Sequence, residues 1–506
     1  MVHSPVTRPG LLLALLPIVL TFAVLGVQLF IFDDFTPHVP LIIGIAITAL
    51  VGRYLGLSWE DMEKGMLHVV SVGLPAVGIL MLVGMITGLW IASGTVPTLI
   101  YYGLELLSPQ IFLAAATLLC ALVSVSLGTS WGTVGTVGLA LMGIGAGFGI
   151  PPYWTAGAVV SGAFFGDKVS PLSDTTNLAP AVTGVNLFDH IRNLMPTTLP
   201  SMAIALVIYL MVGQGMVGDQ AASFERISSI TEGLSQHFDI TATSLLPALV
   251  VIALAMLRFP ALPVLFVGVL LGGVMAFLQQ GESVSTLFAF AFSGYSIDTG
   301  VAEIDGLLNR GGLQSMTWVI TLLLIALSFG GILERTGCMH AIISAIVRRV
   351  KSFGGLQTSA IASSMSTNLV AGDPYLSITL TGRMFGPVYR GKGYSLLNLS
   401  RATEEGGTLI SPLIPWNAGG AVVITALGLN SGAGGMESLM YIPLAFACWI
   451  SPLIGVTYAW LGWFSPRASE SEVAQWHANG EEIMDFNASS QSGAAVRGVD
   501  VATRMP

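Results

Sequence analysis

The sequence predicts an all-α protein that crosses a membrane about 10–12 times, at about 20 residues per crossing. Of its 506 residues, 53% are apolar and 9% are charged, whereas soluble domains carry about 25% charged residues. Mean hydropathy is +0.79. The 60 glycines and 25 prolines are typical of membrane helices that pack closely and are interrupted. So few charges cannot cover a water-facing surface, which excludes a soluble enzyme, a DNA-binding protein and a disordered scaffold.

The first apolar run, residues 11–32, is expected to be a transmembrane helix. It is longer than the core of a signal peptide, and no small-residue cleavage site follows it. Several later runs are too short to cross a bilayer alone, which indicates discontinuous helices and hairpin-like breaks. These later runs are 39–55, 72–90, 110–127, 133–148, 153–165, 196–212, 243–257, 261–277, 316–333, 357–369, 376–385, 395–403, 418–427 and 441–464.

Basic residues in the short loops predict the orientation, because Lys and Arg favour the cytoplasmic side. Both chain ends are expected in the cytoplasm, with segments 33–34, 215–239 and 298–305 outside. The polar tail is rich in small residues, so we expect it to be disordered. The basic residues expected on the cytoplasmic side are Arg8, Arg53, Lys64, Arg192, Arg258, Arg348, Arg349, Lys351, Arg390, Lys392 and Arg467.

The two halves of the chain resemble each other in sequence. Three short motifs of the first half recur in the same order in the second half, at a nearly constant offset. They are 88–94 with 331–337, 128–133 with 372–377, and 169–172 with 410–413. Chance similarity between glycine-rich apolar stretches is the alternative explanation.

The basic residues suggest that the two copies have opposite orientations. Segment 338–351 carries three basic residues, whereas its counterpart 95–107 carries none. We therefore predict an inverted-topology repeat, an arrangement in which secondary transporters place the substrate site where the repeats meet. The predicted units are a cytoplasmic N-terminus 1–9, a first repeat 10–214, an external linker 215–240, a second repeat 241–464 and a cytoplasmic tail 465–506.

A polar segment at 166–177 predicts a broken helix inside the membrane. Pro171 lacks a backbone donor and disfavours helix just before it. Irregular backbone is tolerated at membrane depth only against protein or a wet cavity, and hard cations prefer dense oxygen ligands. An ordinary loop outside the membrane is the alternative. The candidate ion ligands here are Asp167, Ser170, Ser173, Asp174, Thr175, Thr176 and Asn177.

A second break at 404–417 and hairpin-like segments at 126–133 and 364–375 repeat this logic. Their candidate ion ligands are Thr129, Ser130, Thr133, Asn368, Asp373, Ser411 and Asn417. Hydroxyls on membrane helices also commonly bond to backbone, which is the alternative for each Ser and Thr. Charge-modulating roles are assigned to Lys168, Arg401, Glu404 and Glu405. Either glutamate could instead face a loop, and Arg401 could simply pair with an acid or extend to the membrane interface.

The sequence gives little support to a metal site, a nucleotide site, a protease or a channel. Cys120, Cys338 and Cys448 have no metal-binding spacing, and segment 143–149 lacks the strand and lysine of a nucleotide site. No cofactor, nucleotide or nucleic acid is therefore expected. Segment 128–132 fits G-x-S-x-G, but no histidine lies deep in a span to act as base, so an intramembrane protease is disfavoured. A channel fits less well than alternating access, because the carboxylates lie on paired inverted breaks.

Segments 128–133, 166–177 and 411–413 resemble the NhaC-type Na⁺/H⁺ antiporter family of the ion-transporter superfamily. The resemblance implies a bacterial inner-membrane protein that exchanges Na⁺, or alternatively Li⁺, for H⁺. Asp174, with Asp167 or Asp373, would then hold Na⁺ and protons in turn. The family also includes malate and lactate exchangers, so an organic-acid exchanger or Na⁺-coupled carboxylate transporter is the alternative. A homodimer stays open, because aromatic residues are spread too evenly to indicate a dimer face.

Overall fold

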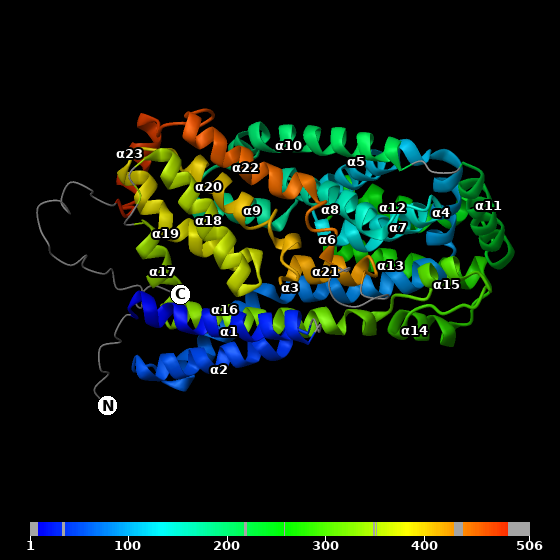
Figure 1. Ribbon diagram of the computed structural model, residues 1–506, viewed down its shortest axis with the longest axis horizontal. Coiled ribbons are helices and arrows are strands. Elements are labelled where there is room, and N and C mark those ends of the chain that lie inside the picture. Colours follow the sequence, from blue (N-terminus) through cyan, green and yellow to red (C-terminus); the bar gives the residue numbers. More distant parts are fainter. Residues whose placement is uncertain are drawn as a thin grey trace, which may run out of the picture.

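The computed structural model describes residues 9–32, 36–216, 220–257, 259–347, 350, 352–429 and 439–483. Within this part of the chain the regular elements are helices, which form one elongated bundle (Figure 1). Seven helices are long and apolar enough to cross a membrane, and a pair bent by 93° makes an eighth candidate. The predicted all-α membrane fold is confirmed. The predicted cytoplasmic residues Arg8, Arg258, Arg348, Arg349 and Lys351 lie outside the described residues.

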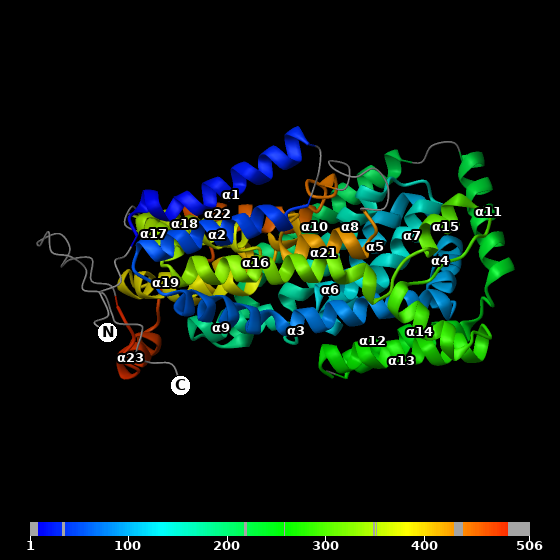
Figure 2. The same cartoon turned by 90° about the horizontal axis from the view of Figure 1, so that it is seen from below.

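The first half of the chain contains a long helix, broken helices and a surface helix. α1 and α2 lie along one side of the bundle (Figures 1 and 2). The capping box of Ser58 and Asp61 starts α3. In order, the elements are α1 (Leu11–Ile31), α2 (His38–Tyr54), α3 (Trp59–Ala92), α4 (Thr95–Leu106), α5 (Pro109–Leu127), α6 (Ser130–Thr133), the π-helical turn η1 (Val134–Gly138), α7 (Leu139–Gly147), α8 (Pro152–Val169), α9 (Asp174–Thr183), α10 (Leu187–Gly215) and α11 (Gln220–His237).

The second half continues with the same kinds of elements. They are η2 (Ala242–Leu245), α12 (Leu246–Met256), α13 (Ala261–Gln279), α14 (Val284–Ser293), α15 (Ala302–Leu308), η3 (Leu313–Met316), α16 (Thr317–Arg335), α17 (Cys338–Val347), α18 (Phe353–Ala371), α19 (Pro374–Gly391), α20 (Leu396–Gly406), η4 (Ser411–Leu413), α21 (Ala418–Ala426), α22 (Phe446–Leu461) and α23 (Glu470–Ala478). The predicted runs 153–165 and 196–212 are parts of the longer helices α8 and α10, and the expected linker 215–240 contains α11.

Glycines with a left-handed backbone conformation end helices at corresponding places in the two halves. Gly94 separates α3 from α4, and Gly337 separates α16 from α17. Likewise Gly128 ends α5 and Gly372 ends α18. These turns need φ near +70°, which favours glycine. The corresponding helices α4 and α17 lie at opposite ends of the bundle (Figure 1). This order of elements agrees with the predicted inverted repeat, which stays a prediction.

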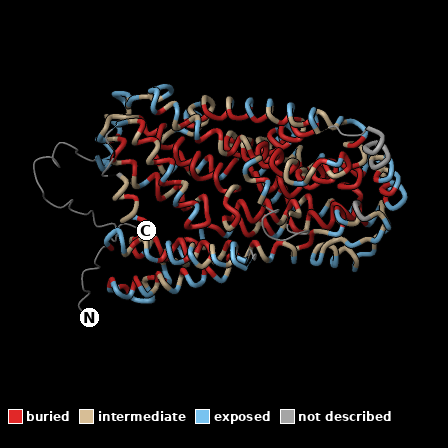
Figure 3. Tube along the Cα trace, in the orientation of Figure 1, coloured by how far each residue is buried: buried red, intermediate tan, exposed pale blue. Residues whose placement is uncertain are grey.

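Apolar side chains cover both the interior and much of the outside of the bundle. Figure 3 shows buried residues concentrated in the inner helices and exposed ones along the periphery. Leu12 on α1, Phe30 on α1 and Leu278 on α13 are at least 70% exposed. Large exposed apolar surface is unfavourable in water, so this outer face is suited to lipid.

The expectation of disorder in the tail is wrong for residues 465–483. This segment forms α23 and packs against the end of the bundle that carries α19 and α20 (Figure 1). Trp476 is buried, and Glu481 lies 2.8 Å from the guanidinium of Arg390. An apolar anchor and an ion pair therefore order the segment, although its composition is polar. Residues 484–506 lie outside the described residues.

Candidate functional site

α8 ends at Val169 and α9 begins at Asp174, so the helix is interrupted inside segment 166–177, as the sequence predicts. The Ser173 hydroxyl accepts a hydrogen bond from the Thr176 N–H at 3.3 Å and thereby caps α9. The Thr176 hydroxyl donates to the carbonyls of Asp167 at 2.9 Å and Lys168 at 3.1 Å. Side chains of the break thus satisfy backbone groups that the interruption exposes.

Two further helix ends point at the same region. Thr129 caps α6 by accepting from the Gly132 N–H at 3.3 Å, and Asp373 caps α19 by accepting from the Tyr375 N–H at 3.2 Å. Asp174 is the first residue of α9. Helix N-termini favour negative charge, so they stabilise the carboxylates of Asp174 and Asp373 at this place.

These helix ends surround a small polar cavity, hereafter the central cavity. It has a volume of about 20 Å³, which is enough for one water-sized group. Both halves of the chain contribute to it, because α3, α6, α8 and α9 meet α19 and the segment after α20 there. The lining residues are Ile79, Thr129, Ser130, Trp131, Phe164, Asp167, Asp174, Thr175, Pro374, Tyr375, Thr408 and Ser411.

Two carboxylates of the central cavity have no basic side chain beside them. The Ser130 hydroxyl donates to Asp167 Oδ2 at 2.6 Å, while Asp167 Oδ1 is buried without a hydrogen-bond partner in the described part of the chain. Asp174 accepts from the Tyr375 hydroxyl and, at 2.8 Å, from the Thr175 N–H. Among the described residues, no Lys or Arg nitrogen lies within 4 Å of either carboxylate. Ionised carboxylates in such a place would attract a cation.

Glu404 and Glu405 are fully buried on α20, so the alternative that they face a loop is wrong. Glu404 Oε1 accepts from the Thr408 hydroxyl at 2.7 Å and from the Thr175 hydroxyl at 3.3 Å. Both donors line the central cavity. Glu404 is thus connected to the cavity by hydrogen bonds, whereas Glu405 is not among the lining residues.

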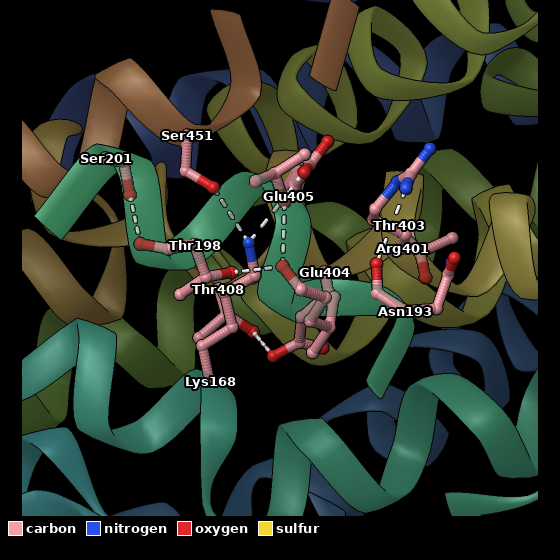
Figure 4. A network of polar contacts seen from close by, with 12 residues as sticks. Lys168, Asn193, Thr198, Ser201, Arg401, Thr403, Glu404, Glu405, Thr408 and Ser451 are labelled. Atoms are coloured by element: carbon pink, nitrogen blue, oxygen red, sulfur yellow. Dashed lines mark hydrogen bonds and ion pairs between the residues drawn. The ribbon is translucent and has the colours of Figure 1, made fainter. Parts of the chain in front are cut away.

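Lys168 and Arg401 are also fully buried. The Lys168 ammonium donates to the Ser451 hydroxyl at 3.0 Å and lies 3.9 Å from Glu405 Oε1 (Figure 4). Arg401 donates to the Asn193 carbonyl at 3.4 Å. The alternative that Arg401 extends to the membrane interface is wrong because its side chain is enclosed in protein, and within the described residues it has no acid within 4 Å.

The structure separates the predicted ligands into two groups. Thr129, Ser130, Asp167, Asp174, Thr175 and Ser411 line the central cavity. The others bond elsewhere: Ser170 to the Val125 carbonyl at 2.7 Å, Thr133 to the Thr129 carbonyl at 2.9 Å, Asn177 to the Ser173 carbonyl at 2.6 Å, and Asn417 to Asn368 Oδ1 at 2.6 Å. Ser173, Thr176 and Asp373 serve as helix caps or close the break.

Three lining residues with polar side-chain atoms were absent from the predicted ligand set, namely Trp131, Tyr375 and Thr408. A signal for two of them exists in the sequence, because the internal repeat aligns Trp131 with Tyr375. Aromatic side chains at equivalent positions of two polar segments could have marked both as part of one site. Thr408 had no such signal, since it belongs to the glycine-rich stretch that follows Glu405.

Broken helices that meet at a carboxylate-lined cavity, inside a bundle with an apolar outer face, define a class: polytopic membrane proteins built like secondary transporters. The particular family follows from the sequence comparison. The chain belongs to the Na⁺/H⁺ antiporter family, whose model matches residues 162–463. The matched region includes the first break, the second break and most residues of the central cavity.

Relatives support this assignment over nearly the whole chain. The chain is 43% identical to the Na⁺/H⁺ antiporter NhaC of Alkalihalophilus pseudofirmus, over 84% of this chain and 90% of the relative. It is 37% identical to the malate-2H⁺/Na⁺-lactate antiporter of Bacillus subtilis, covering 87% and 94% of the two chains. It is also 37% identical to the arginine/ornithine antiporter ArcD of Halobacterium salinarum, covering 91% and 94%.

Proposed function

We propose that this protein is a transporter, not an enzyme, and exchanges Na⁺ for H⁺ across a bacterial inner membrane. The observation that carries the proposal is the pair of carboxylates, Asp167 and Asp174, which share one small cavity without a basic partner within 4 Å among the described residues. Uncompensated carboxylates in a confined site need a cation. Sodium ions and protons both meet that need, and they compete because each neutralises the same charge.

Neutral oxygens in the central cavity complete the proposed sodium site. The hydroxyls of Thr129, Ser130, Thr175 and Ser411 lie in the lining beside the two carboxylates. Hard cations are held by such mixtures of carboxylate and neutral oxygen ligands. When sodium leaves, a proton on Asp167 Oδ1 would neutralise the carboxylate and give this unpartnered oxygen a hydrogen. The same carboxylate would therefore hold either ion, but not both.

The size of the cavity favours an ion over an organic acid. A volume of about 20 Å³ holds one water-sized group, whereas malate or lactate contains several such groups. The positive ends of α6, α9 and α19 would suit an anion, but Asp174 and Asp373 already occupy two of them. The organic-acid alternative keeps the support of one relative's name and is decided by the flux assay below.

The two predicted inverted halves would supply a route for alternating access. α8 and α9 of the first half and α19 and α20 of the second half carry the groups around the central cavity. Movement of one part of the bundle against the rest would expose this cavity to each side in turn. We place both termini in the cytoplasm, as the distribution of basic residues predicts.

Proteoliposomes that contain the purified protein and a pH-sensitive dye test the proposal. Sodium addition should dissipate an imposed pH gradient, whereas K⁺, malate, lactate and arginine should not; Li⁺ is measured in parallel. Asp174→Asn should abolish sodium-driven proton movement because it removes the charge that binds both ions. Asp189→Asn, at an exposed site on α10, is the matched control. Full exchange by the Asp174→Asn protein would exclude Asp174, and a response to malate or lactate alone would support the alternative.

A further inference from the structure

Lys168 and Glu405 form a second charged site outside the lining of the central cavity. Their side chains are fully buried, and the Lys168 ammonium lies 3.9 Å from Glu405 Oε1 (Figure 4). Neither residue lines the cavity. Lys168 belongs to α8 and Glu405 to α20, so the pair joins one helix from each predicted repeat. We refer to these two residues as the buried pair.

The Glu405 carboxylate is poorly satisfied when it is ionised. The Thr197 hydroxyl faces this carboxylate, but neither carboxylate oxygen has a well-formed hydrogen bond in the described part of the chain. The distance of 3.9 Å to Lys168 is well beyond the approximately 2.7–2.9 Å of a charge-assisted hydrogen bond. A buried carboxylate without hydrogen bonds is energetically costly. Binding a proton would remove that cost.

The Glu405 carboxylate is closely packed on one side and faces a positive charge on another. The carboxylate lies directly against the backbone of α22 at Gly455, where an added Cβ atom would overlap Glu405 Oε2. Lys168 supplies a positive charge on another side. A sodium ion would therefore meet both a steric and an electrostatic barrier. Of the two ions that the proposed function requires, the proton suits this place better, because it needs neither extra space nor further oxygen ligands.

Every helix packed around the buried pair presents few ionisable groups to it. Lys168 and Arg401 together balance Glu404 and Glu405 when all four are charged. A proton on Glu405 therefore leaves one excess positive charge. The other titratable or polar groups that face the pair or Glu404 are Asp167 from α8, Thr175 from α9, His190 and Thr197 from α10, Tyr389 from α19, Cys448 and Ser451 from α22, and Thr408 after α20.

The buried pair is connected to the central cavity through neighbouring residues. Asp167, which lines the cavity, directly precedes Lys168, and Glu404, which bonds to Thr175, directly precedes Glu405. Lys168 and Asp167 both interact electrostatically with Glu404, and such interactions are strong inside a protein because the local dielectric constant is low. A change in the charge of the pair must therefore alter cation binding in the cavity.

We propose that Glu405 is a proton-binding site separate from the sodium site, an inference that rests on the proposed function. A proton from water binds a carboxylate oxygen and returns to water when Glu405 ionises. With Glu405 protonated, the unbalanced Lys168 charge weakens sodium binding in the central cavity. With Glu405 ionised, the charge is balanced and sodium binds. Each sodium ion exchanged is thus coupled to one more proton than the cavity alone would carry.

Glu405→Gln, which mimics the protonated acid, tests this site in proteoliposomes. The number of protons exchanged per sodium ion is obtained from the gradients at which net flux reverses. Exchange of labelled sodium for unlabelled sodium should persist in the variant, with an apparent sodium affinity lowered by about tenfold and less dependent on pH. The proton number should fall by one relative to the wild type. Glu63→Gln, on the exposed surface of α3, should match the wild type.

A double variant distinguishes the effect of the lost charge from a failure of the single variant to fold. Lys168→Met combined with Glu405→Gln removes both charges, a kind of replacement that buried pairs often tolerate. It should retain the lowered proton number and regain the sodium affinity that Glu405→Gln loses. It also carries the test if the single variant does not fold. An unchanged proton number in either folded variant would overturn the proposal. Absence of sodium–proton exchange in the wild type would instead contradict the proposed function itself.

Discussion

At the scale of single residues, the function depends on which oxygens lack an internal partner. Asp167 has one oxygen bonded to Ser130 and one without a partner in the described chain. Ser170 lies only three residues away, but its hydroxyl is used by the Val125 carbonyl. Both residues match the pattern of a cation ligand in the sequence. Their different hydrogen-bond partners place only Asp167 in the central cavity.

Ser130→Ala should weaken sodium binding by about tenfold, because Asp167 loses the hydrogen bond from the Ser130 hydroxyl and buried hydrogen bonds to charged groups contribute roughly 1.5–3 kcal/mol. The measurement is the apparent sodium affinity of exchange in proteoliposomes. Ser126→Ala removes a hydroxyl that bonds only to the Leu122 carbonyl on α5 and serves as the control. Equal affinities for the two variants would contradict a role for Ser130 in the sodium site.

At the scale of elements, glycine turns position the helix ends around the central cavity. Gly128 has φ of +67° and joins α5 to Thr129, the cap of α6. A Cβ atom at Gly128 would lie 2.7 Å from the backbone carbon of Leu172 in the first break. The α5–α6 turn and the break in α8 thus pack directly on each other. This contact fixes where Thr129 and Ser130 meet Asp167.

Gly128→Ala should lower both stability and transport, because it adds backbone strain and a clash. Gly184→Ala is a matched control, since Gly184 has φ of +75° but open space around its Cβ position. Strain alone costs about 1–2 kcal/mol, so the control should show a modest decrease in thermal unfolding temperature and retain exchange. A Gly128→Ala protein as stable and active as the Gly184→Ala protein would show that the contact with Leu172 is unimportant.

At the scale of the whole molecule, the segment 465–483 connects the end of the chain to the helix that carries Glu404 and Glu405. Glu472 on α23 accepts from the Ser395 hydroxyl at 2.8 Å and from the Leu396 N–H at 3.2 Å. It therefore caps the start of α20 from outside that helix. In addition, the Arg467 guanidinium lies 4.0 Å from the ring centre of Tyr394. These contacts anchor the loop between α19 and α20.

Glu472→Ala should destabilise the protein, because it removes the external cap of α20 and the capping box of α23. Loss of a helix cap typically costs about 1 kcal/mol. The midpoint of thermal unfolding in detergent measures the effect. Glu470→Ala, at an exposed position of the same helix, is the control. Identical midpoints for the two variants would indicate that α23 does not stabilise α20.

Sequence alone predicted the membrane fold, the break near Pro171, the acidic and hydroxyl-rich segments and the family, because these depend on local composition and on short motifs. Tertiary packing decided which candidates reach the central cavity. Tyr375 approaches Asp174 from another helix, Glu404 and Glu405 are enclosed between helices, and α23 is ordered by distant partners. A side chain's direction and partners depend on residues far away in the chain, which local patterns do not contain.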